Sequence, residues 1–265
     1  MKPPFNSMGG KSRIAKTICS MYPKHNLYIE PFAGAGSCLF AKHPSTKEWL
    51  NDLDDNIFAV HTFLRDAHYS ELSKWAENKD WILSEESYAK AHLPTKNLGE
   101  KARRFIIKRK GSFASQDHRL YRNKLGKSLS PVKMIPKWHE RLKNVKITQL
   151  DAHELIKQND NLGTLFFIDP PYPKANEKSE IWRNYTMDVL KELISILDNI
   201  RNADWLYAET ESIIPYIPDR WSARYLQRIV PSFSGKRRLQ TEVIYGSDNV
   251  LRQADKIGIP KERIQ

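Results

Sequence analysis

The run LFFI at residues 165–168, followed at once by DPPYP, constrains the fold of this chain more than any other stretch. Four consecutive apolar residues are typical of a strand buried on both faces, as in the middle of a parallel sheet. Asp169 ends the run, and Pro170 and Pro171 cannot continue the ladder because they lack an N–H. Two interpretations stay open here: a rigid turn with Asp169 as an ordinary turn residue, or a site built at the strand's end.

The bulk composition is that of a soluble globular protein, with 40% hydrophobic and 28% charged residues in a chain of 265. This length suits one sizeable core, or one core carrying an inserted subdomain. No apolar run reaches the roughly 18 residues needed to span a bilayer, and the N-terminus lacks the apolar region of a signal peptide. Two cysteines, Cys19 and Cys38, predict neither a disulfide framework nor a zinc cluster, so we expect a cytoplasmic protein.

The positive charge is concentrated in one segment. Residues 101–143 hold fourteen Lys or Arg against two acidic residues, which accounts for the +12 of the whole chain. A solvated charged face is one interpretation. A neutral body carrying one basic segment is also the electrostatic footprint of a protein that binds a phosphate backbone, so we expect a nucleic-acid partner.

The first part of the chain alternates strands and helices. A helix is expected over 10–22, and then NLYIEPF, AGAGSCLFAKH, EWLNDLDDN and NIFAVHTFLRD read as strand, glycine turn with helix, strand and helix. This order is the opening of a doubly wound α/β sheet.

The middle of the chain breaks this alternation. Residues 65–143 are predicted to form an inserted, mostly helical and basic subdomain, and residues 1–64 with 144–250 to form the sheet domain. Strands resume with VKITQLD, TLFFID and DWLYAET, and ARYLQRIVP with RLQTEVIYGS predicts an antiparallel hairpin turning at FSGKRR. The polar tail, 251–265, is expected to be peripheral.

Two glycine-rich stretches are candidates for ligand binding. Gly34 and Gly36, in EPFAGAGS, follow a strand and precede a helix, and Asp52 ends the next strand, where an acid can bind ribose hydroxyls. The glycines also suit a purely structural turn. No third glycine follows at the spacing of dinucleotide-binding turns. This disfavours NAD and favours a smaller adenosine-containing cofactor. In SMGGKSR, Lys11 is either a solvated lysine on a flexible arm or a cation placed for a carboxylate or phosphate.

The order of these motifs resembles one enzyme family. GGK, then PFAGAGS, NDLD, a basic insert and DPPY, together with the closing KRRLQTEVIYGS, resemble the D12-class (Dam-like, alpha-group) DNA adenine-N6 methyltransferases over most of the chain. The resemblance implies a Rossmann-like methyltransferase sheet with a C-terminal hairpin, and an insert that recognises the DNA target. It also implies methyl transfer from S-adenosylmethionine to the N6 amine of adenine in double-stranded DNA.

The resemblance further implies a cofactor site. S-adenosylmethionine is expected over the Gly34–Gly36 turn, with Lys11 on its carboxylate, Asp52 on its ribose and Asp151 near its adenine. The set expected to bind it is Ser7, Gly10, Lys11, Glu30, Phe32, Ala33, Gly34, Gly36, Asp52, Asp151 and Asp169. The family usually carries an aromatic residue where this chain has Ser7, and Phe5 or Met8 are the candidates to replace it.

The chemistry of DPPY supports the same assignment. The lone pair of an adenine N6 amine is delocalised into the ring, so hydrogen-bond acceptors help the amine to pyramidalise and attack a sulfonium methyl group. Asp169 and the carbonyl of Pro170 supply two acceptors that the prolines orient. Tyr172 can stack on a base that has left the duplex. The expected catalytic residues are Asp169, Pro170, Pro171 and Tyr172.

The basic insert and the segment after DPPY supply further candidates. Arginine pairs with phosphates and reads guanine edges; the expected DNA contacts are Arg109, Lys110, Arg119, Arg122 and Lys124. Tyr185 and Trp182 are candidates for a loop that closes on the flipped base, although Trp182 also suits simple packing.

The alternatives concern substrate and activity. They are an RNA adenine or a cytosine-N4 methyltransferase, or a DNA-binding relative without activity; Asp169, where cytosine-N4 enzymes usually carry serine, and the intact motifs disfavour the last two. No metal is expected, since the histidines lack ligand spacing. Recognition sequence, oligomeric state and role, including restriction-modification, stay open.

Overall fold

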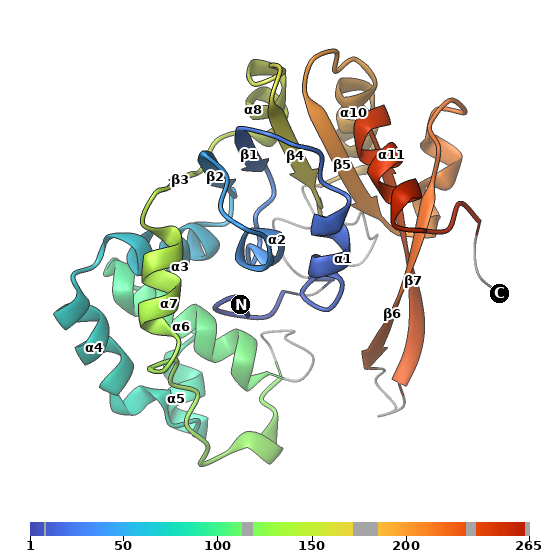
Figure 1. Cartoon of the computed structure of the whole chain (residues 1–265). Coiled ribbons are helices and arrows are strands. Elements are labelled where there is room, and N and C mark those ends of the chain that lie inside the picture. Colours follow the sequence, from blue (N-terminus) through green and yellow to red (C-terminus); the bar gives the residue numbers. More distant parts are fainter. Residues whose placement is uncertain (8, 113–118, 172–184, 232–236, 263–265) are drawn as a thin grey trace.

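The parallel part of one mixed sheet forms the centre of the molecule. The computed structural model describes residues 1–7, 9–112, 119–171, 185–231 and 237–262 (Figure 1). Within them, seven strands follow the order β3-β2-β1-β4-β5-β7-β6. The parallel strands are β1 (Leu27–Glu30), β2 (Lys47–Asn51), β3 (Val145–Thr148), β4 (Thr164–Ile168) and β5 (Asp204–Glu209). The predicted α/β sheet is therefore confirmed, and its order reverses between β1 and β4.

Strand β4 shows why the apolar run belongs in the centre. All five of its residues are buried, and it pairs with β1 on one side and β5 on the other. Because successive side chains point to opposite faces, Leu165 and Phe167 enter one core and Phe166 and Ile168 enter the other. An apolar run without alternation is thus what a strand between two helical layers requires.

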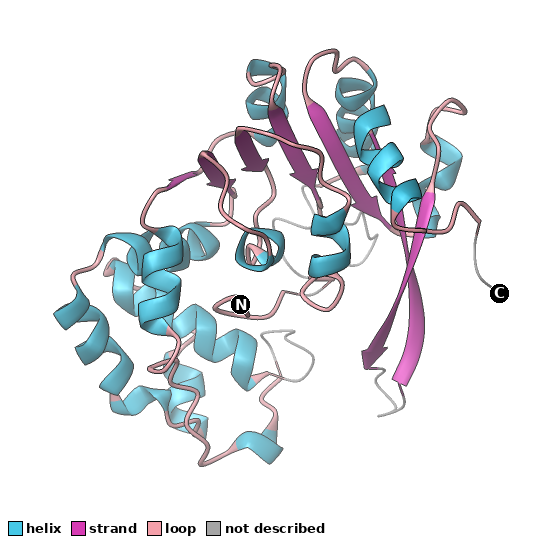
Figure 2. Cartoon of the chain, in the orientation of Figure 1, coloured by secondary structure: helices cyan, strands magenta, loops and turns pink. Residues whose placement is uncertain are grey.

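Helices cover both faces of the sheet (Figure 2). The first core contains residues of α1 (Ala15–Ser20), α2 (Ser37–Ala41) and α3 (Asp55–Asp66). The second core contains residues of α8 (Ala152–Gln158) and α10 (Met187–Asp198). The carboxyl ends of the parallel strands are left for a site, because the helices pack against the faces.

The middle of the chain is helical, as predicted. Its elements are α4 (Tyr69–Glu77), η1 (Lys79–Trp81), α5 (Glu85–Lys90), α6 (Leu98–Gly111), η3 (Arg122–Lys124) and α7 (Ile135–Leu142). Helices α6 and α7 pack against α3, and Phe63 of α3 lies 5.2 Å from Trp75 of α4 between ring centroids. The insert thus continues the first core, while its exact boundaries, 65 and 143, stay a prediction.

The insert lies beyond the carboxyl ends of the parallel strands, and the far end of the β6–β7 hairpin extends in the same direction (Figure 1). β6 (Arg224–Pro231) and β7 (Arg237–Gly246) are antiparallel, as predicted, and η4 (Glu211–Tyr216) precedes them. The predicted turn at 233–238 lies largely outside the described residues. Both segments can therefore reach the end of the sheet where the strands stop.

The chain after Asn249 differs from the expectation of a peripheral tail. Helix α11 (Asp248–Lys256) packs against β5 and β7, with Val250 and Ala254 fully buried. Arg224 also pairs with Asp255 at 2.7 Å. The sequence looked peripheral because the helix is polar on its outer face, and only its narrow apolar stripe contacts the sheet. In the described part of the chain, no helix combines the length and apolarity required to cross a membrane.

Candidate active site

A cavity of about 540 Å³ lies at the carboxyl ends of β1, β2 and β4. In open α/β sheets this position, where the strand order reverses, is the usual ligand site. Predicted cofactor and DPPY residues line it: Ser7, Gly10, Lys11, Glu30, Phe32, Ala33, Gly34, Asp52, Asp151, Asp169, Pro170 and Pro171. Gly36 is not among the lining residues. The structure therefore gathers at one place residues that are up to 164 positions apart in the chain, although their individual roles stay predictions.

The floor of the cavity is the turn between β1 and α2. Gly34 and Gly36 have φ of 49° and 69°, a conformation that side chains rarely adopt. A side chain on Gly34 would also reach within 3.4 Å of Ser7 Oγ. The turn is closed by a hydrogen bond of 2.7 Å from the Gly36 amide to the Ala33 carbonyl. The left-handed backbone of the turn is therefore the reason for glycine at both positions.

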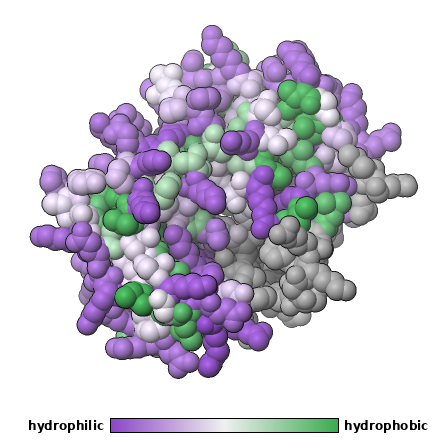
Figure 3. All heavy atoms as spheres, turned by 60° about the horizontal axis from the view of Figure 1, so that its bottom comes forward, coloured by the Kyte–Doolittle hydropathy of each residue, from purple (hydrophilic) through white to green (hydrophobic). Residues whose placement is uncertain are grey.

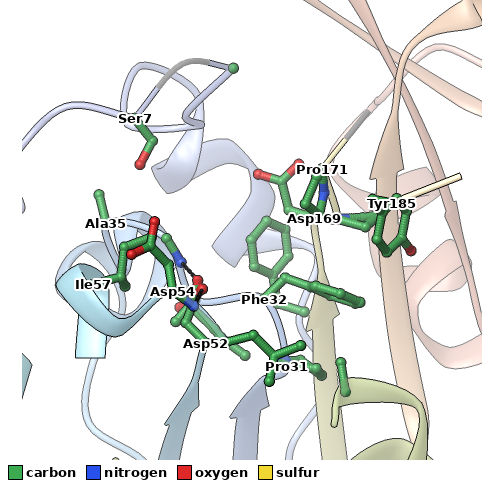
Figure 4. Close-up of a pocket in the computed structure, with 18 of the residues that line it drawn as sticks. Ser7, Pro31, Phe32, Ala35, Asp52, Asp54, Ile57, Asp169, Pro171 and Tyr185 are labelled. Atoms are coloured by element: carbon green, nitrogen blue, oxygen red, sulfur yellow. Dashed lines mark hydrogen bonds between the residues drawn. The ribbon is translucent and has the colours of Figure 1, made fainter. Parts of the chain in front are cut away.

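Asp52 holds this turn from the end of β2. Its carboxylate accepts hydrogen bonds from the Gly34 amide at 2.7 Å and the Asp54 amide at 2.9 Å (Figure 4). Burial nevertheless raises the pKa of Asp52 to about 6. Figure 4 shows Asp52 and Asp169 coming from different strands to the same cavity. An acid placed here can accept hydrogen bonds from hydroxyl groups when it is ionised.

A second buried acid, Glu30, ends β1 and ties the turn to α2. Its Oε1 accepts hydrogen bonds from the Tyr28 hydroxyl at 2.9 Å and the Leu39 amide at 2.6 Å. Burial raises the pKa of Glu30 to about 8, so the side chain is mostly neutral at pH 7. These contacts join β1 to α2 on the two sides of the glycine turn, which is a role that the sequence alone did not reveal.

Asp169 lies directly after β4 and beside Lys11. The Lys11 ammonium is 2.5 Å from Asp169 Oδ1, and the lysine side chain is only 1% exposed. The resemblance predicted Lys11 on the cofactor carboxylate; in the structure its nearest acid is Asp169. Sequence reasoning missed this pair because the two residues are 158 positions apart. Their motifs, GGK and DPPY, were the only signal available.

The N-terminal arm fills a different role from the one expected. Phe5, a candidate to replace the missing aromatic residue at Ser7, is 1% exposed and packs edge-on against Phe105 at 5.0 Å. It therefore belongs to the core between the arm and the insert, and the expectation that it contacts the cofactor is corrected. Met8, the other candidate, lies outside the described residues.

Three other lining residues bear on the predictions or on the apolar surface of the cavity. Tyr185, predicted to belong to a base-closing loop, stands edge-on to Phe32 at 5.8 Å. Ile57, in the first turn of α3, adds an apolar wall that the sequence did not single out. Arg109, predicted as a DNA contact, reaches the same cavity from the end of α6. Tyr172 and Trp182 lie outside the described residues.

The other predicted DNA contacts differ in exposure. Arg119 and Arg122 are exposed, and Arg122 lies 3.3 Å from Glu85. Lys110 lies 5.8 Å from the Trp138 ring centroid, and burial lowers its pKa to about 8. Lys124 donates a hydrogen bond to the Lys110 carbonyl. Arg119 and Arg122 are thus the better placed of the five for a large partner. On the face shown in Figure 3, hydrophilic residues predominate and hydrophobic ones are scattered.

Comparison with known proteins establishes the family. The model of the D12 class N6 adenine-specific DNA methyltransferases matches residues 7–198, and the chain belongs to this family. It is therefore a methyltransferase with S-adenosylmethionine as its cofactor. No curated protein matches the chain.

Several solved structures are similar at low identity. The yhhF protein from Escherichia coli, a suggested methyltransferase, is 12% identical with a TM-score of 0.42, covering 94% of this chain and 92% of its own. Precorrin-6y C5,15-methyltransferase from Geobacter metallireducens is 8% identical, with a TM-score of 0.39 and coverage of 89% and 87%. SMU.1697c from Streptococcus mutans, a suggested methyltransferase in complex with SAH, is 10% identical, with a TM-score of 0.37 and coverage of 89% and 97%.

The cavity fits this cofactor. The open Gly34 turn leaves room where a side chain would intrude, and Asp52 faces the same space with carboxylate oxygens. Phe32 and Ile57 supply apolar surface for a base or thioether. Among the described residues, no group of three His, Cys, Asp or Glu is arranged to hold a metal ion.

Proposed function

We propose that the chain transfers a methyl group to the N6 amine of adenine in duplex DNA, after the base has left the stack. One observation supports the proposal most strongly. Asp169 and Pro170 line the cavity at the carboxyl end of β4, and the basic insert lies beyond this end of the sheet. An amine acceptor site and a cationic surface therefore occur at the same end of the sheet.

The chain's contribution to the reaction is to orient the amine. Asp169 and the Pro170 carbonyl accept hydrogen bonds from N6, which favours the pyramidal form whose lone pair can attack. The prolines fix the direction of that carbonyl. S-adenosylmethionine supplies the sulfonium methyl group. As the new N–C bond forms, the bond between sulfur and the methyl carbon breaks and a neutral thioether leaves, so the positive charge passes from sulfur to N6. N6 then loses a proton to solvent, and the carboxylate of Asp169 stabilises the charge until it does.

Other cavity residues would hold the cofactor. Asp52 is placed to accept hydrogen bonds from ribose hydroxyls, and Asp151, at the start of α8, to lie near the adenine ring. Phe32 and Ile57 would cover its apolar parts, and the Gly34 turn would let the backbone approach the methionine moiety. Lys11, beside both the turn and Asp169, joins the cofactor site to the acceptor site.

A duplex substrate requires base extrusion, because N6 of a stacked adenine cannot enter a cavity at the end of the sheet. The insert would bind the backbone through exposed cations such as Arg119 and Arg122. Tyr172, in the part of the chain that the structure does not describe, is the proposed stacking partner. With this substrate, we expect the protein in the cytoplasm of a bacterium or of a phage-infected cell.

The proposal is tested by incubation with tritiated S-adenosylmethionine and duplex DNA, followed by nucleoside analysis. We expect label in N6-methyl-2′-deoxyadenosine from DNA, none with the Asp169→Ala variant, and none in an equal mass of RNA. Label in N4-methylcytosine, or in RNA alone, would contradict the proposed substrate while leaving methyl transfer intact. No label from any nucleic acid would contradict both.

A further inference from the structure

Four charged side chains from distant parts of the chain meet beside the cavity. Lys11 lies 2.5 Å from Asp169 and 3.4 Å from Glu242 Oε2 of β7. Glu242 Oε1 lies 2.6 Å from Arg228 of β6, and Gln240 donates to the same oxygen at 3.3 Å. The result is a continuous chain of ion pairs from the hairpin to the DPPY acid.

This network is buried. The side chains of Lys11 and Glu242 are 1% and 0% exposed, and that of Arg228 is 6% exposed. A buried charge is costly unless it is paired, and truncating one partner leaves the others uncompensated. Glu242 balances two cations at once, so it is the residue on which the arrangement depends.

The β6–β7 hairpin also forms a hydrogen bond with the main chain just before Lys11. Arg228 donates a hydrogen bond of 2.7 Å to the Gly10 carbonyl. The Lys11 ammonium has three N–H donors, and the oxygens of Asp169, Glu242 and Gly9 surround it, the last at 3.3 Å. Both the main chain and the side-chain head of this lysine are therefore held by contacts that include β6 and β7.

Lys11 in turn orients the acid that faces the substrate. It contacts Asp169 Oδ1, so in this proposal Oδ2 is the oxygen that accepts a hydrogen bond from an amine in the cavity. A small displacement of the lysine would rotate this carboxylate, and displacements near 1 Å at a catalytic group can cost about 100-fold in rate.

We propose that Glu242, together with Arg228, is a positioning residue of the active site, which sets the orientation of Asp169 through Lys11. The C-terminal hairpin is thus part of the catalytic apparatus as well as an edge of the sheet. This inference rests on the proposed transfer to an amine. It gives a role to Arg228 and to Glu242, neither of which was among the site residues predicted from the sequence, although Glu242 lies within the closing KRRLQTEVIYGS.

The chain offers a matched control for a purely structural role. Glu48 of β2 is also a buried glutamate between a lysine and an arginine: it lies 2.5 Å from Lys42 and also contacts Arg141. It does not line the cavity, in contrast to Lys11 and Asp169. Glu48→Gln therefore breaks a similar network at a place where no orientation of Asp169 is involved.

The first test needs no substrate. In protein with nitrogen-15 lysine, the Lys11 ammonium signal is assigned by its absence in Lys11→Met. We expect Glu242→Gln and Arg228→Gln to shift or broaden this signal, and Glu48→Gln to leave it unchanged, while SAH binding by calorimetry stays within threefold in all three. An unchanged Lys11 signal in both hairpin variants would overturn the proposal whether or not the protein methylates adenine.

The second test uses turnover. Glu242→Gln should lower kcat by about 100-fold with little change in KM for the cofactor, Glu242→Asp should restore part of it, and Glu48→Gln should stay within threefold. In the Lys11→Met background, Glu242→Gln should have almost no further effect, because it acts through Lys11. Equal losses in Glu242→Gln and Glu48→Gln, or additive losses with Lys11→Met, would show a structural role instead.

Discussion

The two cationic regions of the molecule use positive charge in opposite ways. At the end of the sheet, Lys11 and Arg228 are buried and paired with Asp169 and Glu242. In the insert, Arg119 and Arg122 are exposed. The partner of a buried charge cancels most of its electric field, so the charge attracts distant ligands only weakly. The pair does hold the two side chains in one geometry. An exposed excess of positive charge does not hold neighbouring side chains in place. It attracts a phosphate backbone from a distance, and salt screens this attraction. The buried pairs are therefore the candidates for a role in the reaction, and the exposed arginines are the candidates for DNA binding.

The largest expected effect is at the buried end. Asp169→Ala should lower methyl transfer by at least about 1,000-fold, because both the amine acceptor and the nearer of the two acids beside Lys11 are lost. Single-turnover transfer measures this, and fluorescence anisotropy should show duplex affinity within severalfold of the unchanged protein. Loss of DNA binding to the same degree would mean that Asp169 is structural and would remove the distinction between the two regions.

The next effect is at the exposed end. Reversing both charges, with Arg119→Glu and Arg122→Glu, should weaken duplex binding tens of fold at low salt and reduce the salt slope by about 2, if each arginine neutralises one phosphate. The control is Lys47→Glu with Arg201→Glu, which makes the same change in net charge. Both residues are exposed, Lys47 at the start of β2 and Arg201 three residues before β5, so they lie at the amino ends of these strands, away from the cavity. Titrations over a range of salt concentrations measure both. An unchanged slope in the insert variant would place the DNA path elsewhere.

The smallest effect concerns pH at the cofactor site. Asp52 has a pKa of about 6 because it is buried, so it is largely ionised at pH 7 and largely neutral at pH 5. SAH affinity should therefore fall on the order of tenfold from pH 7 to pH 5, as the acceptor for the ribose hydroxyls is protonated. Glu30, with a pKa of about 8, stays protonated over this range. Calorimetry at both pH values measures the change.

Asp52→Asn is the control for this pH effect. It should bind SAH weakly at both pH values, because no carboxylate remains to titrate. An equal pH dependence in the variant would assign the effect to another titratable group, and Asp52 would then not be the acceptor for the ribose hydroxyls.

Local patterns were sufficient for the elements and the motif positions. The buried LFFI run, the Gly34–Gly36 turn and the acid that ends each neighbouring strand are encoded by adjacent residues, and parallel strands bring their carboxyl ends to one edge. Two predictions were wrong because they concern contacts between parts of the chain that are far apart in sequence. Phe5 joined the core and α11 packed on the sheet, because each is buried by a surface from elsewhere in the chain.

By itself, the sequence determined the order of strands and helices along the chain, the positions of the glycine turn and of DPPY, and the concentration of the net positive charge in the insert. Only the tertiary structure decided which charges are neutralised. Lys11 meets an acid 158 positions away and another on β7, whereas Arg119 remains at the surface. The physical reason is that local conformational preferences act over a few residues, while the pairing of a buried charge depends on which strands become neighbours in the folded sheet.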